Sequence, residues 1–371
     1  MELDADFDGG SITLVEQDGP ASFVLALRPD NAAELRQWFA FRLRGAAGTR
    51  VRLSIVDAGS ARYRRGFQDY RAWVSADGER WAPVTTHFDG TALTLLHTPR
   101  ADEVRYACFP LYDGGRREAL MARVRDSAHL GALTLGPSVM GRSVDAIVGG
   151  SPRGPLVWIV ARQHPGETVA EWVIEGLVER LLAARDGATQ ALLERVRLVI
   201  VPCMNPDGAA VGNHRTNGAG VDLNRAWLEP DGERSPEVAH VREHLEEEGV
   251  DLFLDVHGDE TIPYAFLAGC EGNPGYSPAM AAAEAELRAR FAAENPEFRT
   301  EGGYPLEDPG TADLSLAANW VAERFDCPAI TLELPMKHRI EGGELRWGPV
   351  RARAFGANLV TVLAGFSERW S

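Results

Sequence analysis

Hydrophobic and polar residues alternate along short segments in the first third of the chain, which is typical of strands with one buried face. Turn-forming residues such as Ala76-Asp77-Gly78-Glu79 separate these segments and predict hairpin connections. Residues 31–36 fit either a short helix or a loop. Four segments show the strand pattern, at residues 51–56, 70–75, 91–96 and 104–109. We therefore expect an antiparallel β-sandwich over residues 1–115.

The periodicity changes at residue 116, where strands begin to alternate with amphipathic helices. Residues 156–161 are apolar throughout, as in a strand buried on both faces. Apolar positions in residues 168–184 recur at helical spacing. Further strands are expected at residues 196–201, 251–256 and 329–334, and further helices at residues 116–129 and 351–367. This alternation predicts an α/β domain over residues 116–371.

Polar residues collect where four of the predicted strands end, which is where open α/β sheets place their sites. His164-Pro165-Gly166-Glu167 follows the first of these strands, and His257 follows another. Two histidines and a glutamate suit a catalytic zinc ion, which takes three protein ligands and leaves one position to water. Each fragment alone is more often a solvated, capping or core residue. Their occurrence at successive strand ends favours a metal site.

A zinc-bound water needs a base to accept its proton and a cation to stabilise the oxyanion. Glu333 suits the base, because a carboxylate in an otherwise apolar strand is costly unless it is paired or functional. A paired edge-strand glutamate is the alternative. Arg215 suits the oxyanion, while Asn224 and Arg225 suit a substrate carboxylate, which guanidinium binds in bidentate geometry.

The combination of these motifs resembles the M14-type zinc carboxypeptidases, and more narrowly their cytosolic, deglutamylase-like branch. It is carried by H-P-G-E, N-P-D-G, G-N-x-R-x-N, D-L-N-R, D-x-H-G and L-E-L, over about residues 115–370. The cytosolic branch is also similar in placing a small β-sandwich before the catalytic domain. The resemblance implies a mixed-sheet α/β zinc carboxypeptidase domain after that sandwich.

The resemblance assigns the metal site and the base. His164, Glu167 and His257 match the ligands of one zinc ion per chain, and Glu333 matches the general base that acts on the zinc-activated water. The implied reaction is removal of the C-terminal residue from a peptide or protein.

The resemblance also assigns residues that contact the substrate. Arg215 matches the arginine that polarises the scissile carbonyl, and Asn224 with Arg225 matches the pair that binds the C-terminal carboxylate. The family usually adds a tyrosine on a mobile loop before the base. Tyr304 is the candidate for this residue, although no motif marks it.

The identity of the leaving residue is open at this stage. The cytosolic branch implies glutamate as a candidate, and Lys337 and Arg339, just after the base, suit either an acidic side chain or the surface. A zinc-dependent deacylase of N-acyl amino acids, similar to aspartoacylase and succinylglutamate desuccinylase, is the alternative enzyme. A non-catalytic module that binds C-terminal tails is a third hypothesis, which the presence of the complete ligand set and Glu333 disfavours.

One further motif competes with the proposed metal site. Residues 240–244 read H-x-x-E-H, the inverted zinc-protease motif. The segment lies among many glutamates and has little apolar character, so we expect a solvated helix face instead.

The composition of the chain argues against some classes of binding partner. Asp and Glu number 54 against 38 Lys and Arg, a net charge of −16, which argues against nucleic acid as a partner. No apolar run is long enough to span a membrane. The first residues lack the pattern of a secretory signal, and the four cysteines are scattered singly, so we expect a cytoplasmic enzyme. The oligomeric state is not predicted.

Overall fold

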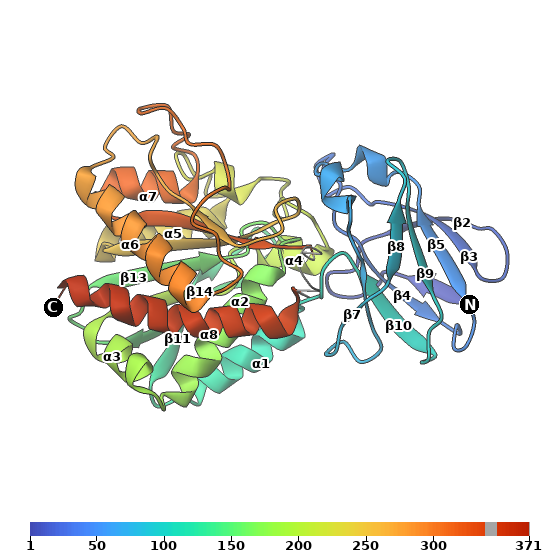
Figure 1. The fold of residues 1–371 in the computed structure, drawn as a ribbon, viewed down its shortest axis with the longest axis horizontal. Coiled ribbons are helices and arrows are strands. Elements are labelled where there is room, and N and C mark those ends of the chain that lie inside the picture. The colour runs from blue at the N-terminus through green and yellow to red at the C-terminus, as the bar shows by residue number, and fades with distance from the viewer. Residues whose placement is uncertain (338–346, 371) are drawn as a thin grey trace.

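The computed structural model describes residues 1–337 and 347–370. Figure 1 shows two lobes, one made of β-sheets from the N-terminal part of the chain and one in which helices surround a central sheet. The two ends of the chain lie at opposite ends of the molecule (Figure 1). Among the described residues, no helix combines the length and the apolar character needed to cross a bilayer.

The N-terminal lobe consists of two five-stranded sheets, as the sandwich prediction requires. All strand pairs in it are antiparallel except β3 with β5, which run parallel. One sheet has the order β1 (Glu2–Asp4), β4 (Ala40–Arg44), β10 (Glu103–Ala107), β6 (Trp73–Ser75) and β7 (Ala82–Pro83). The other has the order β2 (Thr13–Gln17), β3 (Ser22–Ala26), β5 (Val51–Ile55), β9 (Leu93–His97) and β8 (Thr85–Phe88).

The alternation in the sequence matches burial in this lobe. Val51, Leu53 and Ile55 of β5 are buried, whereas the side chains between them are more exposed. The aromatic residues of the lobe mostly fill the space between the sheets, as the stacked rings of Phe41 and Tyr106 illustrate. Residues 31–36 form a loop without a helix. Two short 3-10 helices, η1 (Ala58–Ser60) and η2 (Arg64–Phe67), follow β5.

The C-terminal lobe is built on a seven-stranded mixed sheet, which confirms the α/β prediction. Its four central strands are parallel, and the strands at both edges are antiparallel to their neighbours. The order is β11 (Leu130–Pro137), β12 (Ser143–Gly150), β14 (Arg197–Val201), β13 (Leu156–Ala161), β15 (Leu252–Asp259), β17 (Ala329–Pro335) and β16 (Phe266–Ala268). The hairpin of β11 and β12 was not predicted, and β15 extends three residues beyond its predicted end.

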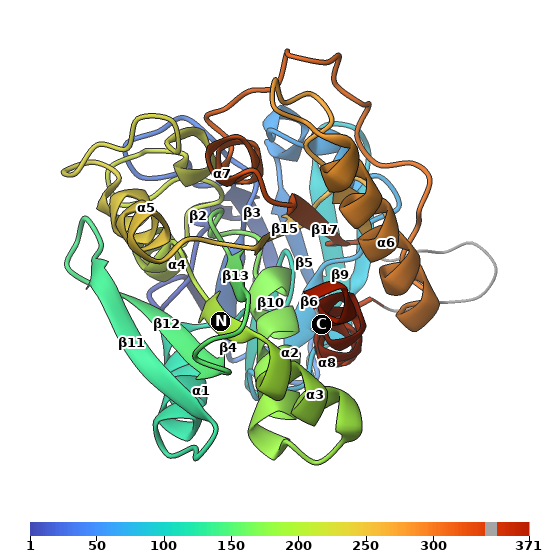
Figure 2. The ribbon, with the colours of Figure 1, turned by 90° about the vertical axis from the view of Figure 1, so that its left-hand side faces the viewer.

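Helices cover both faces of this sheet (Figure 2). They are α1 (Gly114–Arg125), α2 (Val169–Ala183), α3 (Gly187–Arg195), α4 (Pro206–Val211), η3 (Leu223–Arg225), α5 (Pro236–Glu248), α6 (Pro278–Glu294), α7 (Ala317–Phe325), α8 (Pro349–Phe366) and η4 (Ser367–Trp370). Successive residues of β13 point to opposite faces and therefore join two hydrophobic cores. Val157, Ile159 and Ala161 pack with residues of α2 and α8, and Leu156, Trp158 and Val160 with residues of α5 and α7.

Helices α2 and α8 approach each other through glycines. A Cβ added to Gly356 of α8 would overlap the carbonyl oxygen of Val173 in α2, and one added to Gly176 of α2 would overlap the carbonyl oxygen of Arg353. The absence of side chains at these two positions lets the helix backbones pack in direct contact.

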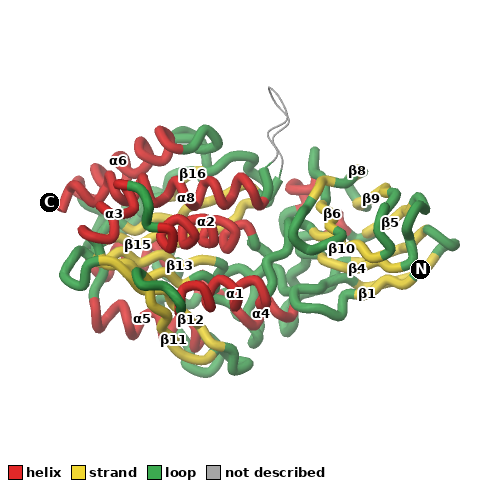
Figure 3. Tube along the Cα trace, turned by 90° about the horizontal axis from the view of Figure 1, so that it is seen from below, coloured by secondary structure: helices red, strands yellow, loops and turns green. Residues whose placement is uncertain are grey.

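The two lobes are joined by backbone contacts. Figure 3 shows the two lobes side by side, seen from below. The amide of Gly9 donates to the carbonyl of Ala210 at 2.9 Å. A Cβ on Gly66 would lie 2.6 Å from the carbonyl oxygen of Glu260, so only glycine fits there without a shift. Strand β10 ends at residue 107 and α1 begins at residue 114. We propose that the boundary between the two domains lies between residues 115 and 116.

Candidate active site

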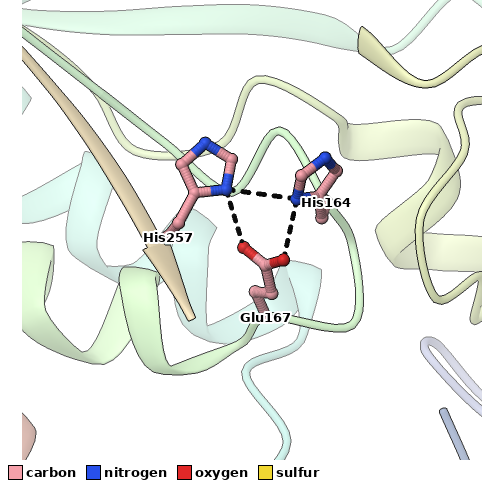
Figure 4. Close-up of side chains that lie close together, drawn as sticks. All are labelled: His164, Glu167 and His257. Atoms are coloured by element: carbon pink, nitrogen blue, oxygen red, sulfur yellow. Dashed lines mark hydrogen bonds and ion pairs between the residues drawn. The ribbon is translucent and has the colours of Figure 1, made fainter. Parts of the chain in front are cut away.

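The carboxyl ends of two neighbouring parallel strands, β13 and β15, bring the predicted metal ligands together. His164 lies in the loop after β13, Glu167 lies two residues before α2, and His257 lies within β15. All three side chains are buried. Figure 4 shows them pointing toward one another although they come from separate elements.

The donor atoms of these residues lie within 4.8 Å of one another. The two carboxylate oxygens of Glu167 lie 2.7 Å from His164 Nδ1 and 2.9 Å from His257 Nδ1, and the two Nδ1 atoms are 3.1 Å apart (Figure 4). Burial raises the pKa of Glu167, but the two imidazole rings outweigh burial and hold this pKa well below its ordinary value.

The chemistry of this donor set fits a cation. His164 Nε2 lies 3.0 Å from Asp222 Oδ1, and His257 Nε2 lies 2.9 Å from Asp255 Oδ2. In the neutral tautomer in which Nε2 donates to its aspartate, the Nδ1 lone pair of each ring faces Glu167. Two nitrogen lone pairs and a carboxylate then face one another without a proton between them. A divalent cation such as zinc satisfies all three.

Glu333 of β17 lies beside this set. Its register partner across the two parallel strands is His257 of β15. The side chain is 6% exposed, and its Oε2 atom is buried without a hydrogen-bond partner in the described structure. Burial, with a smaller contribution from the carboxylates of Glu167 and Asp259, raises the pKa of Glu333 to about 8.

Tyr304 reaches Glu333 from the loop between α6 and α7. Its hydroxyl lies 3.1 Å from Glu333 Oε1 and 2.8 Å from Asp259 Oδ2, so its single proton is donated to one of two carboxylates. Gly302 and Gly303 precede it with φ angles of 93° and 92°, which favour glycine. The ring is about half exposed. The structure therefore brings the sequence candidate next to the predicted base.

Two side chains, those of Asp222 and Tyr63, hold Arg215 in place next to His164. Its Nε donates to Asp222 Oδ2 at 2.6 Å, and its Nη1 donates to the hydroxyl of Tyr63 at 2.9 Å. Asp222 thus contacts both Arg215 and His164. Tyr63 belongs to the N-terminal lobe. Arg215 is 6% exposed, and although burial lowers its pKa, Asp222 raises it above its ordinary value, so the guanidinium is charged.

Asn224 and Arg225 lie in η3 but differ in environment. Asn224 is buried, and its Oδ1 accepts from the amide of Ala317 at 2.8 Å. Its Nδ2 lies 3.3 Å from His257 Nε2. Arg225 is exposed, and its Nε is 3.9 Å from a carboxylate oxygen of Asp313. Arg225 can therefore contact a solute, whereas the Asn224 side chain already has protein partners.

Sequence reasoning missed the residues that orient the histidines. Asp222 and Asp255 occur within D-L-N-R and D-x-H-G, and Asp255 also accepts from Gln163 Nε2 at 2.7 Å. The signal was present, because Asp255 is a charged residue in an apolar strand, two positions before a metal-ligand candidate. Tyr63 carries no comparable local signal.

The rival motif gives no comparable cluster. His240 and His244 lie on α5, and His244 Nδ1 contacts the backbone oxygen of His240. In residues 1–337 and 347–370, His164, Glu167 and His257 are the one group of three or more His, Cys, Asp or Glu with converging donor atoms. Lys337 donates to the Gln68 carbonyl at 2.9 Å. Arg339 lies outside the described residues.

Two family models match the chain. Residues 3–109 match the cytosolic carboxypeptidase N-terminal domain, and residues 119–342 match zinc carboxypeptidase. The first match lies in the N-terminal lobe and the second in the C-terminal lobe, where it ends before α8.

Two relatives match over nearly the whole chain, and a third matches over a shorter segment. An uncharacterized protein of Zymomonas mobilis is 40% identical over 366 residues, which cover 98% of this chain and 96% of that protein. The solved metallo-carboxypeptidase from Pseudomonas aeruginosa, in complex with (2-guanidinoethylmercapto)succinic acid, is 42% identical, with a TM-score of 0.96 and complete coverage of both chains. Human cytosolic carboxypeptidase 4 is 40% identical over 121 residues, which cover 31% of this chain and 11% of that protein.

Proposed function

The chain belongs to the zinc carboxypeptidase family and is a metallocarboxypeptidase, and from this premise we propose which residues act in catalysis and which substrates the enzyme takes. We propose that it hydrolyses the C-terminal residue of peptides or proteins, with acidic residues such as glutamate among those removed. The observation that carries the proposal is the convergence of three metal donors beside Glu333.

In this proposal, His164, Glu167 and His257 hold one zinc ion per chain. The chemistry that zinc supplies in such a site is Lewis-acid polarisation of a carbonyl group and a lowered pKa of water. Glu333 acts as the general base. Its buried Oε2 has a lone pair free to accept a proton, and a pKa of about 8 is near the value that general-base catalysis requires. A nearby divalent cation favours the ionised form of Glu333 and therefore opposes this rise in its pKa.

Arg215 is proposed to stabilise the negative charge that develops on the scissile carbonyl oxygen. Its charge is buried and its orientation is set by two partners, which is the preorganisation that makes such stabilisation effective. Arg225, with Asn224, is proposed to bind the C-terminal carboxylate of the substrate. The exposed guanidinium of Arg225 supports this role, because it can reach a ligand and pair with it in bidentate geometry. Tyr304 is proposed to contact the substrate near Glu333.

The proposed preference for acidic residues rests on the resemblance to the cytosolic, deglutamylase-like branch, whose N-terminal domain model matches residues 3–109. The Pseudomonas aeruginosa protein is described in complex with a succinic acid derivative that carries two carboxyl groups and also a basic guanidino group, so this ligand by itself does not distinguish acidic from basic leaving residues. We also propose a cytoplasmic location. The cytosolic carboxypeptidase domain match and four buried, unpaired cysteines support it.

The test is a C-terminal ladder assay on a mixed peptide library, read by mass spectrometry, with a panel of N-acyl amino acids in parallel. We expect single-residue losses from C-termini, most rapidly for glutamate, and no loss from C-terminally amidated peptides. Metal analysis should find about one zinc per chain, and chelation should abolish an activity that added zinc restores.

Other outcomes would redirect the proposal. Hydrolysis of N-acyl amino acids without peptide cleavage would identify a deacylase. Peptide binding without turnover in the zinc-loaded protein would identify a binding module. Rapid loss of residues other than glutamate would keep the carboxypeptidase and reject the acidic preference.

A further inference from the structure

The backbone that carries Arg215 is held by a carboxylate from the other lobe. Asp30 accepts hydrogen bonds from the amides of His214, Arg215 and Thr216, at 2.6, 2.8 and 2.8 Å. It also accepts from the hydroxyl of Thr216 at 3.0 Å. Asp30 is 4% exposed. Three consecutive amides that share one buried carboxylate are fixed in position more firmly than a surface loop would be.

A second contact from the same lobe fixes the side chain. The hydroxyl of Tyr63 accepts from Arg215 Nη1 at 2.9 Å. Tyr63 is itself oriented, because its amide donates to Gln37 Oε1 at 2.9 Å and its ring packs edge-on against His214, with ring centres 5.8 Å apart. Burial, together with the charge of Arg215, lowers the pKa of His214 to about 3, so the ring beside Tyr63 is neutral.

The chemistry of these partners preserves the charge of Arg215. A tyrosine hydroxyl orients a guanidinium without neutralising it, whereas a second carboxylate would compete with a substrate oxyanion for the same charge. The one carboxylate on this guanidinium, Asp222, also serves His164. The contacts of Asp222 and Tyr63 use Nε and Nη1, and neither uses Nη2.

We propose that Asp30 and Tyr63 are positioning residues for catalysis, through which the N-terminal sandwich holds Arg215 against the metal site. This inference rests on the proposed role of Arg215 in stabilising the oxyanion. It gives the sandwich a part in the reaction: the catalytic lobe holds the metal ligands, the base and Asp222, and the sandwich supplies the other groups that orient this arginine.

The test compares full-length, zinc-loaded Tyr63→Phe with wild-type enzyme on the best peptide from the ladder assay. We expect kcat to fall about tenfold, because one hydrogen bond to a charged group is lost. KM and zinc content should stay within twofold of the wild type. Tyr106→Phe is the matched control, since it removes a buried hydroxyl of the same lobe that contacts His97 Nδ1 at 2.9 Å, away from Arg215. Its kcat should not change.

A double mutant separates positioning from loss of folded structure. If Tyr63 acts through Arg215, Tyr63→Phe should cause no further loss of kcat in an Arg215→Ala background. Asp30→Asn, which keeps one acceptor oxygen, should lose less kcat than Asp30→Ala. Multiplicative losses in the double mutant, or a Tyr63→Phe enzyme with kcat within twofold of the wild type, would overturn the inference. An Arg215→Ala enzyme with full activity would instead reject the proposed role of Arg215.

Discussion

His257 and Glu333 are direct register partners on adjacent parallel strands. This pairing places a metal-ligand candidate and the base candidate side by side through backbone geometry alone, on strands β15 and β17, whose residues are almost all buried. The distance between their backbones is therefore fixed by sheet hydrogen bonding and does not depend on a loop.

Replacing Glu333 by glutamine should abolish turnover while metal binding persists. The amide keeps the size of the side chain but cannot accept the proton, so we expect kcat to fall by a factor of about 10² to 10⁴. Zinc content, measured by atomic emission on the same sample, should equal that of the wild type. Turnover at the wild-type rate would rule out Glu333 as the base.

Replacing Arg225 by alanine should mainly weaken substrate binding. Loss of a charge-assisted contact to the substrate carboxylate should raise KM roughly 10- to 100-fold and remove the preference for free over amidated C-termini. Arg153→Ala is a suitable control, because Arg153 is exposed before β13, at the opposite end of that strand from the site. If the wild type cleaves amidated peptides as fast as free ones, the carboxylate role is wrong.

Replacing both His240 and His244 by alanine should leave zinc content and activity unchanged. Both residues lie on α5, separate from the converging donor set. Stability should fall modestly, because the half-buried ring of His240 packs against Gly136. Loss of zinc from the double mutant would mean that the metal site is misplaced.

Glu284 of α6 should make stability depend on pH. It is 2% exposed, and burial raises its pKa from 4.5 to about 7. Between these values the folded protein keeps a proton that the unfolded chain releases, so the free energy of unfolding falls as pH rises, by about 3 kcal/mol in all. Glu284→Gln should therefore stabilise the protein by about 2 kcal/mol at pH 8, after the loss of the hydrogen bond from Tyr276, and slightly destabilise it at pH 5.

Urea denaturation at the two pH values measures this difference. Glu243→Gln, an exposed change on α5, serves as the control and should be neutral at both. An equal effect of Glu284→Gln at pH 5 and pH 8 would show that Glu284 is ionised in the folded protein at both values.

Gly356→Ala should destabilise the fold, because the added methyl group meets the backbone of α2, which cannot move as a side chain can. We expect a loss of about 3 kcal/mol, at the upper end of the range for overpacking. Gly365→Ala in the same helix meets only the end of the Arg290 side chain, so it should be neutral or slightly stabilising. Thermal unfolding of the two variants measures the contrast; equal melting temperatures would contradict it.

Sequence reasoning succeeded where burial is uniform along an element. Residues 156–161 coincide with β13 because every side chain in this strand is buried, and the apolar run has no other explanation. It underestimated β15, because His257, Gly258 and Asp259 do not look like strand residues, although they continue the pairing with β17.

The convergence of the three candidate metal ligands could be predicted for a similar reason. Each follows or ends a strand, so its position depends on local pattern and on the general geometry of parallel sheets. The contacts of Tyr63 and Asp30 with Arg215 could not be predicted, because they depend on how the two lobes dock. The sequence around either residue contains no motif that indicates this contact. Asp222 lies between these cases, because its motif was recognised but its two partners were not.

The hydrogen bonds from residues 214–216 to Asp30 also affect the order of events during folding. These three amides have their acceptor 184 to 186 positions earlier in the chain, so the loop cannot reach its final form until the sandwich has docked. Contacts between such distant residues are slow to form. During refolding, secondary structure and metal uptake should therefore appear first, and hydrolytic competence should appear last.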